Sequence, residues 1–381
     1  MLRHTPFVAL LLLATAAAQS APPPSSDQRV PPVHPASSSS SALEQKIDRM
    51  FRGCTRPGVP GAVVLVAEGD RVLLQKAYGL ADLERGVPLT VDSVLDIGST
   101  SKQFTATCLL LAELDGKLSL DDPVRKHVDE LPACCEGVTL RHLMLHTSGI
   151  PDYIGLMIEG GAQVEDRTGN DDALAALAKI EKLDFPVGTK WEYSNSNYML
   201  MSQVVERTTG LSLPDFAQSR IFDVLGMKHT HVHRDCTSLV PNRALSYSRG
   251  PGGWRWNFSN WEQTGDGAVF TTVGDLLTWA RNFERGDVGG AKLLDRMSRP
   301  GRLDDGTDID YGTGLVFERI GEHRVVSHGG AWAAYRAELL RIPAKRITVV
   351  CLCNRDDMNP SRRARRIAGL VLGKEGGAEG R

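Results

Sequence analysis

The chain has 381 residues, of which 41% are hydrophobic and 24% are charged. These proportions are typical of a globular protein and exclude a disordered or fibrous chain. The formal net charge of −2 gives no sign of the basic surface that binds nucleic acid, so no nucleic-acid partner is expected.

The first residues predict a secretory signal peptide. Arg3 and His4 precede an apolar run from Phe7 to Ala18, which is too short to cross a bilayer and ends in small residues typical of a cleavage site. We expect residues 1–18 to be removed, the mature protein to be periplasmic or secreted, and no membrane insertion after cleavage. Residues 19–42 are rich in Ser and Pro and should form a linker.

One folded domain is expected over residues 43–372, followed by a flexible tail, 373–381. Residues 43–51 have a helical pattern, and residues 61–78 form two β-rich runs around Gly69-Asp70, which predicts a hairpin. A helix is expected over residues 99–115.

The second half of the chain returns to strands after a helical middle over about 116–260. Strands are expected at 325–326, 337–342 and 347–353, and a closing helix at 362–372. Strands at both ends of the chain predict one sheet that both ends complete, with an inserted, mostly helical region. The fold class is therefore α+β.

Ser99 and Lys102 have the spacing of a nucleophile and its base, in Asp96-Ile-Gly-Ser-Thr-Ser-Lys. In a helix that starts at Ser99, Lys102 lies one turn later on the same face. A partly desolvated amine can take the hydroxyl proton and activate the serine. Taken alone, the pattern fits a capped helix start better, because Ser is a favoured N-cap.

Two later segments add polar groups. Tyr193 and Asn195 form a Tyr-x-Asn motif, in which a phenol near an ammonium ion can relay a proton. The segment Ser-His328-Gly329-Gly330-Ala331 leads into a strand, where glycines admit a substrate close to the backbone and N–H groups can form an oxyanion hole. Each segment alone would be explained as a polar turn.

The three motifs in this order resemble the β-lactamase-related serine hydrolases, a penicillin-binding-protein-like family that includes class C β-lactamases, esterases and D-aminopeptidases. Leu143-Met-Leu-His-Thr-Ser-Gly-Ile, Gly265-Asp-Gly and Thr271-Thr-Val-Gly-Asp-Leu-Leu-Thr-Trp also resemble segments of this family, as does Val349-Val-Cys-Leu-Cys-Asn. The resemblance extends from about residue 45 to 372. It implies a β-lactamase/transpeptidase-like fold, an antiparallel sheet flanked by helices.

The resemblance also implies roles at the matching positions. Ser99 would be acylated, Lys102 and Tyr193 would share the general-base and general-acid steps in an order that the sequence leaves open, and Asn195 would contact substrate. The N–H groups of Ser99 and Ala331 would form the oxyanion hole. Water would then attack the acyl-enzyme, and no metal or organic cofactor is implied.

His328 departs from the family pattern, because a Lys begins this triplet in many members and helps bind substrate carboxylates. A His is mostly neutral at neutral pH. The substitution resembles the esterase and D-aminopeptidase branches, so an ester, amide or D-amino-acid peptide substrate is favoured and a β-lactam stays possible. Arg336 could restore a positive charge, although a surface or structural role is the simpler interpretation.

Two alternatives come from other classes. His231, His233 and Asp235 match the start of a zinc hydrolase motif, but Cys236 follows where that motif needs another His, so a polar strand or loop is the simpler explanation. A catalytically inactive protein that binds cell-wall peptide or a partner is the other alternative. Against it, Ser99, Lys102 and Tyr193 are all present.

Overall fold

The computed structural model describes residues 41–373 of the chain. The predicted signal peptide, almost all of the predicted linker and residues 374–381 of the tail lie outside the described residues. Helix α1 (Ala42–Phe51) begins one residue before the expected domain start, because the Ser41 hydroxyl accepts the Glu44 N–H and caps the helix.

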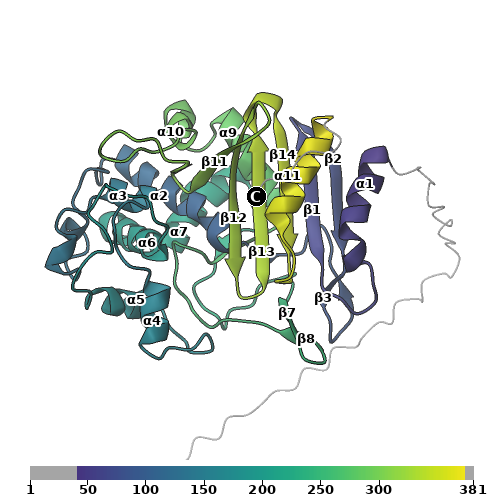
Figure 1. The fold of residues 1–381 in the computed structure, drawn as a ribbon, viewed down its shortest axis with the longest axis horizontal. Helices are drawn as coiled ribbons and strands as arrows, with labels where there is room; N and C mark the ends of the chain where they lie inside the picture. The colour runs from purple at the N-terminus through teal and green to yellow at the C-terminus, as the bar shows by residue number, and fades with distance from the viewer. Residues whose placement is uncertain (1–40, 374–381) are drawn as a thin grey trace, which may run out of the picture. The chain divides into compact units, whose positions relative to one another are not determined.

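A seven-stranded antiparallel sheet in the order β10-β11-β12-β13-β14-β1-β2 forms the centre of the domain (Figure 1). Strand β1, near the start of the described chain, pairs with the late strand β14 in a register that places Val64 opposite Cys351. The predicted sheet, completed by both ends of the chain, is confirmed. Its strands are β1 (Ala62–Glu68), β2 (Arg71–Tyr78), β10 (Tyr311–Gly312), β11 (Leu315–Ile320), β12 (His323–Trp332), β13 (Tyr335–Ile342) and β14 (Ile347–Cys353).

Helices cover both faces of this sheet, which is why its central strands are apolar on both sides. Val64 and Val349 pack into a cluster with α1 and α11 (Pro360–Val371). Val63 and Val350 point the opposite way and join a larger cluster with α9 (Val273–Arg285) and the helical region. In Figure 1 the yellow helix α11 lies along β13 and β14.

The inserted region is mostly helical, as predicted, and packs around the buried helix α2 (Lys102–Leu114). Helix α6 (Asn195–Thr209) makes the most extensive contact with α2. No helix in residues 41–373 has both the length and the apolar character needed to cross a membrane. The remaining helices are α3 (Leu140–Leu145), α4 (Tyr153–Glu159), α5 (Asn170–Leu177), α7 (Leu213–Ala217), α8 (Asp223–Leu225) and α10 (Gly290–Met297).

Short strands connect the helical region to the sheet. A three-stranded sheet in the order β5-β9-β6 lies beside the start of α2. The short strands are β3 (Leu80–Asp82), β4 (Val87–Pro88), β5 (Leu95–Asp96), β6 (His231–Val232), β7 (Tyr247–Gly250), β8 (Gly253–Trp256) and β9 (Val269–Thr271).

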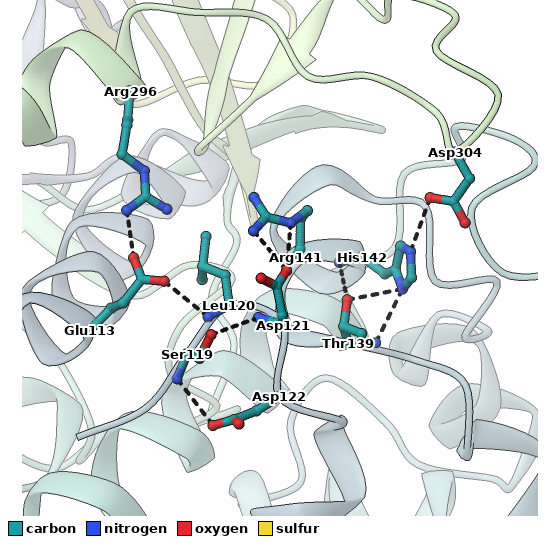
Figure 2. Close-up of polar contacts among 10 residues, drawn as sticks. All are labelled: Glu113, Ser119, Leu120, Asp121, Asp122, Thr139, Arg141, His142, Arg296 and Asp304. Atoms are coloured by element: carbon teal, nitrogen blue, oxygen red, sulfur yellow. Dashed lines mark hydrogen bonds and ion pairs between the residues drawn. The ribbon is translucent and has the colours of Figure 1, made fainter. Parts of the chain in front are cut away.

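Polar contacts hold the C-terminal end of α2 against its neighbours (Figure 2). Glu113 of α2 forms an ion pair with Arg296 of α10. Thr139 caps α3 through a reciprocal pair of hydrogen bonds with His142, whose other ring nitrogen lies 3.4 Å from Asp304. The Glu113–Arg296 pair ties α2 to α10, and the opposite end of α2 carries the candidate site.

Candidate active site

Ser99 and Lys102 lie where β5 runs into α2. The predicted helix starts with a 3-10 turn, Gly98–Ser101, and becomes α-helical only at Lys102. The turn still places the two side chains on one face, with Lys102 Nζ 3.1 Å from Ser99 Oγ. The sequence-predicted pair is therefore in hydrogen-bond contact.

The ammonium group of Lys102 is fully buried and has three acceptors. Besides Ser99 Oγ, they are Asn195 Oδ1 at 2.8 Å and the main-chain oxygen of Asp266 at 2.7 Å. Two of these acceptors are carbonyl oxygens, which can only accept. A neutral Lys102 would therefore keep its two N–H bonds on Asn195 and Asp266 and direct its lone pair at Ser99 Oγ.

The Tyr-x-Asn motif lies at the start of α6, beside Lys102. Asn195 donates its main-chain and side-chain N–H groups to one carboxylate oxygen of Asp152, each at 2.8 Å, which turns its amide oxygen toward Lys102. The Tyr193 ring centroid lies 4.8 Å from Lys102 Nζ. The Tyr193 hydroxyl is buried and has no hydrogen-bond partner within residues 41–373, so a substrate atom could use it.

Two glycines allow strand β12 to pack directly against the Ser99 turn. Gly98 has a φ of +48°, and a Cβ atom there would lie 2.6 Å from the Ala331 nitrogen. A Cβ atom on Gly330 would lie 1.8 Å from the Ile97 carbonyl oxygen. Since no side chain fits on either side, the Ala331 main chain lies against the Ser99 turn, where an oxyanion hole is expected.

His328 lies in β12 at the end of a chain of hydrogen bonds. Its Nδ1 lies 2.6 Å from the Gly329 carbonyl oxygen, so Nδ1 must donate and Nε2 must accept. Tyr311 therefore donates its hydroxyl proton to His328 Nε2, 3.2 Å away, and accepts from His146 Nε2 at 3.3 Å. The other nitrogen of His146 accepts the Ser194 N–H. Neutral imidazoles satisfy every member of this chain.

The electrostatics agree with a neutral His328. Burial, together with the positive charge of Lys102, lowers the pKa of His328 to about 4, and burial also lowers the pKa of His146 well below its usual value. Arg336 donates to the carbonyl oxygens of Ala333 and Tyr335 in its own turn. His328 thus supplies no cation in place of the family's Lys, and the simpler, structural interpretation of Arg336 fits its contacts.

A pocket of about 310 Å³ opens beside Ser99, a volume suited to a small substrate. Ser99, Asn195 and Ala331 are among the residues that line it, whereas Lys102, Tyr193 and His328 are not. Residues 151–175 and 248–264 both contribute aromatic side chains to it. Its aromatic lining residues are Tyr153, Trp256, Phe258, Trp261, Phe270, Trp332 and Tyr335.

Three polar residues of the site were not predicted as members of it. Asp152 orients Asn195, Tyr311 joins His146 to His328, and Asp266 lines the pocket beside Lys102. Asp266 lies within the Gly-Asp-Gly segment that the sequence offers only as a family resemblance. Nothing in the local sequence around Asp152 or Tyr311 indicates a role.

The alternative zinc ligands do not come together. His231 and His233 hydrogen-bond to each other at 3.4 Å, and Asp235 accepts hydrogen bonds from its own loop and pairs with Arg167. In the described part of the chain, the ligand atoms that do lie within 4.8 Å of one another belong to Asp235, Cys236 and Glu262. The geometry therefore gives the zinc hydrolase no support.

Comparisons with known proteins agree with the family resemblance that the site residues indicate. The family model "Beta-lactamase" matches residues 47–374. Penicillin-binding protein 4* of Bacillus subtilis is 30% identical over 315 residues, which cover 77% of this chain and 68% of that protein. A D-aminopeptidase of Brucella anthropi is 30% identical over 303 residues, and the chain spans only 56% of its length.

A solved structure with a similar fold comes from the same group of proteins. The octameric penicillin-binding protein homologue from Pyrococcus abyssi superposes with a TM-score of 0.78 at 26% identity, over 87% of this chain and 78% of that one. The predicted penicillin-binding-protein-like α+β fold is confirmed.

Proposed function

The chain belongs to the Beta-lactamase family, and on that premise we propose that it is a serine hydrolase that cleaves amide and ester bonds through an acyl-enzyme on Ser99. The observation that carries the proposal is the hydrogen bond between a fully buried Lys102 and Ser99 at a pocket wall. The contact places a nitrogen that can take the hydroxyl proton 3.1 Å from the nucleophile.

In the proposed reaction, Ser99 Oγ attacks the substrate carbonyl and its proton passes to Lys102. The N–H groups of Ser99 and Ala331 stabilise the oxyanion. The Tyr193 hydroxyl, which has no partner among the described residues, hands a proton to the leaving amine or alcohol and is reprotonated from Lys102. A water molecule then attacks the acyl-enzyme and gives a proton to Lys102, which passes it to Ser99 Oγ as that oxygen leaves, so that the product acid is released and Ser99 is restored.

The chemistry around His328 favours esters and amides over substrates that need a cation for a carboxylate. Both ring nitrogens of His328 are engaged and its pKa is about 4, so it offers no positive charge at neutral pH. Relatives named D-aminopeptidase support an amide or peptide substrate. We therefore place such substrates, or small esters, ahead of β-lactams. Export to the periplasm or the exterior remains part of the proposal.

The test compares hydrolysis of a short-chain nitrophenyl ester and a chromogenic cephalosporin by wild type and Ser99→Ala. Loss of the nucleophile should reduce ester turnover by about 10³-fold or more, with little cephalosporin turnover in either protein. Mass spectrometry after reaction with a fluorophosphonate should find the adduct on Ser99.

Ser101→Ala is the matched control, because Ser101 lies in the same turn but its hydroxyl accepts the Val269 N–H, whereas the Lys102 ammonium bonds to Ser99, Asn195 and Asp266. It should keep most activity while losing about 1 kcal/mol of stability. Unchanged turnover in Ser99→Ala would exclude the mechanism. A Ser99 that no ester, amide or lactam acylates would favour the inactive binding protein.

A further inference from the structure

Arg341 of β13 is a buried arginine whose guanidinium has no hydrogen bond or ion pair to any residue in 41–373. Its side chain is only 7% exposed. It stacks on the Phe283 ring of α9, with Cζ 3.5 Å from the ring centroid, and stacking leaves the N–H groups in the guanidinium plane free to donate. A buried charge without a partner strongly destabilises a fold, so a partner from outside the chain is expected.

Arg341 lines a pocket of about 240 Å³ that is separate from the pocket beside Ser99. The two pockets have no lining residue in common. Val326 of the second pocket precedes Ala331 of the first by five residues in β12, which separates them by about 16 Å along the strand. Of the three Arg341 nitrogens only Nη2 is closed to solvent, so Nε and Nη1 can donate to a ligand in this pocket.

Three adjacent strands direct hydrogen-bond donors into this second pocket. Arg341 lies opposite Val326 of β12 and Thr348 of β14, and residues paired in this way share a face of the sheet. Arg324 precedes Val326 by two residues and lies on the same face. It uses only Nη2, on the Ser298 carbonyl oxygen, and the Thr348 hydroxyl has no hydrogen bond to the described residues. Arg324, Arg341 and Thr348 therefore offer unused donors to the same pocket.

The lining of the second pocket is positively charged. Its charged members are Arg324, Arg341, Arg346 and Glu284, an excess of two positive charges. Glu284 forms its ion pair with Arg346, so it does not neutralise the other two arginines. Burial lowers the pKa of Arg341 only to about 9, so its guanidinium stays charged at neutral pH. A dianion would balance Arg324 and Arg341.

We propose that this second pocket binds a free, doubly charged oxyanion such as phosphate or sulfate. Arg341 donates to the anion from its open nitrogens, and Arg324 and the Thr348 hydroxyl donate to its other oxygens. The anion supplies the partner that the buried guanidinium lacks and links β12, β13 and β14 at the end of the sheet away from Ser99. Binding therefore stabilises the folded protein.

The test measures thermal unfolding in sodium chloride, with and without inorganic phosphate at the same ionic strength. Phosphate should raise the Tm of wild type by about 3 °C once it exceeds its dissociation constant tenfold. Arg341→Met should lose this rise and, in chloride alone, be at least as stable as wild type, because it removes an unpaired buried charge. Arg366→Met is the matched control, since it removes the same charge from an exposed position on α11, across the sheet, and it should keep the rise.

A second measurement needs only wild type, in case Arg341→Met does not fold. Saturating phosphate should slow the modification of Arg324 by phenylglyoxal about tenfold, followed by peptide mass spectrometry, and should leave the modification of Arg366 unchanged. Equal modification of Arg324 with and without phosphate, or the same rise in Tm for wild type and Arg341→Met, overturns the anion site. A larger rise with glycerol 3-phosphate than with phosphate would overturn the assignment to a free anion.

Discussion

The contact between β12 and the Ser99 turn leads to a sharp prediction for two adjacent glycines. Gly330→Ala would place a Cβ atom 1.8 Å from the Ile97 carbonyl oxygen, whereas Gly329→Ala would place it 3.0 Å from Glu338 Oε2 on the opposite side of the strand. Real Cβ atoms essentially never lie within 3.0 Å of another heavy atom. The alanine at 330 must therefore move β12 and the turn apart by more than 1 Å.

Such a shift separates the Ala331 N–H from the position of the oxyanion. Loss of one oxyanion donor costs about 10² to 10³ in kcat, and a misplacement of 1 Å costs about as much. We therefore expect kcat for the nitrophenyl ester to fall by about 10²-fold or more in Gly330→Ala. Gly329→Ala should stay within a few-fold of wild type, because its new contact is with the end of a side chain and not with the Ser99 turn.

The assay measures initial rates beside thermal unfolding, so that an inactive folded protein is distinguished from an unfolded one. Gly98→Ala tests the same contact from the other side, since its Cβ atom would lie 2.6 Å from the Ala331 nitrogen at a φ of +48°. It should also lose activity. A fully active Gly330→Ala, or a Gly329→Ala that loses as much activity as Gly330→Ala, would refute the proposed contribution of this strand.

Three further outcomes are expected. The pKa of His328 is about 4 in the folded protein, against 6.5 in the unfolded chain. The folded state therefore favours neutral His328, and the stability that this provides is complete above pH 6.5 and is lost as the pH falls toward 4. Wild type should therefore lose about 3 kcal/mol more unfolding free energy than His328→Gln between pH 7 and pH 4, measured by urea denaturation. Asp152→Ala should reduce kcat by about 10- to 100-fold with little change in KM, since Asp152 orients Asn195 and caps α4 but does not line the pocket. Asp152→Asn should recover part of the loss, and a change confined to KM would contradict this positioning role. Dialysis against a chelator should leave ester turnover unchanged, and a loss that zinc restores would revive the metal-dependent alternative.

The elements that the sequence predicted are those in which local pattern and tertiary structure agree. Strand β14 is a continuous apolar run because both of its faces are covered, and its pairing with β1 follows from strands at both ends of the chain. The start of α2 differs from the prediction. Gly98 with its positive φ and the contact with β12 hold the first turn in a tighter 3-10 geometry, and that contact comes from residues more than 200 positions away.

The residues of the candidate site also fall into those that the sequence predicts and those that depend on the tertiary structure. Ser99, Lys102, Tyr193 and Asn195 were predicted because fixed short spacings link them to a known chemistry. Asp152 could not be predicted, since its effect on Asn195 depends on how α4 meets α6 in space. Asp266 contributes both its main-chain oxygen and its side chain to the site. A sequence pattern can indicate a role for the side chain only.

His328 shows most directly how long-range contacts change the interpretation of a residue. The sequence indicates only that a His replaces a Lys, and its usual pKa near 6.5 would leave part of it charged under mildly acidic conditions. The Gly329 carbonyl fixes its proton on Nδ1, and Tyr311, itself bonded to His146, occupies Nε2. Protonating His328 would therefore require Tyr311 to reverse its hydrogen bond, and His146 with it, inside a buried network beside Lys102. Because this network holds His328 neutral, β12 presents no cation beside Ser99 at neutral pH, which favours substrates that need no positive charge to bind a carboxylate.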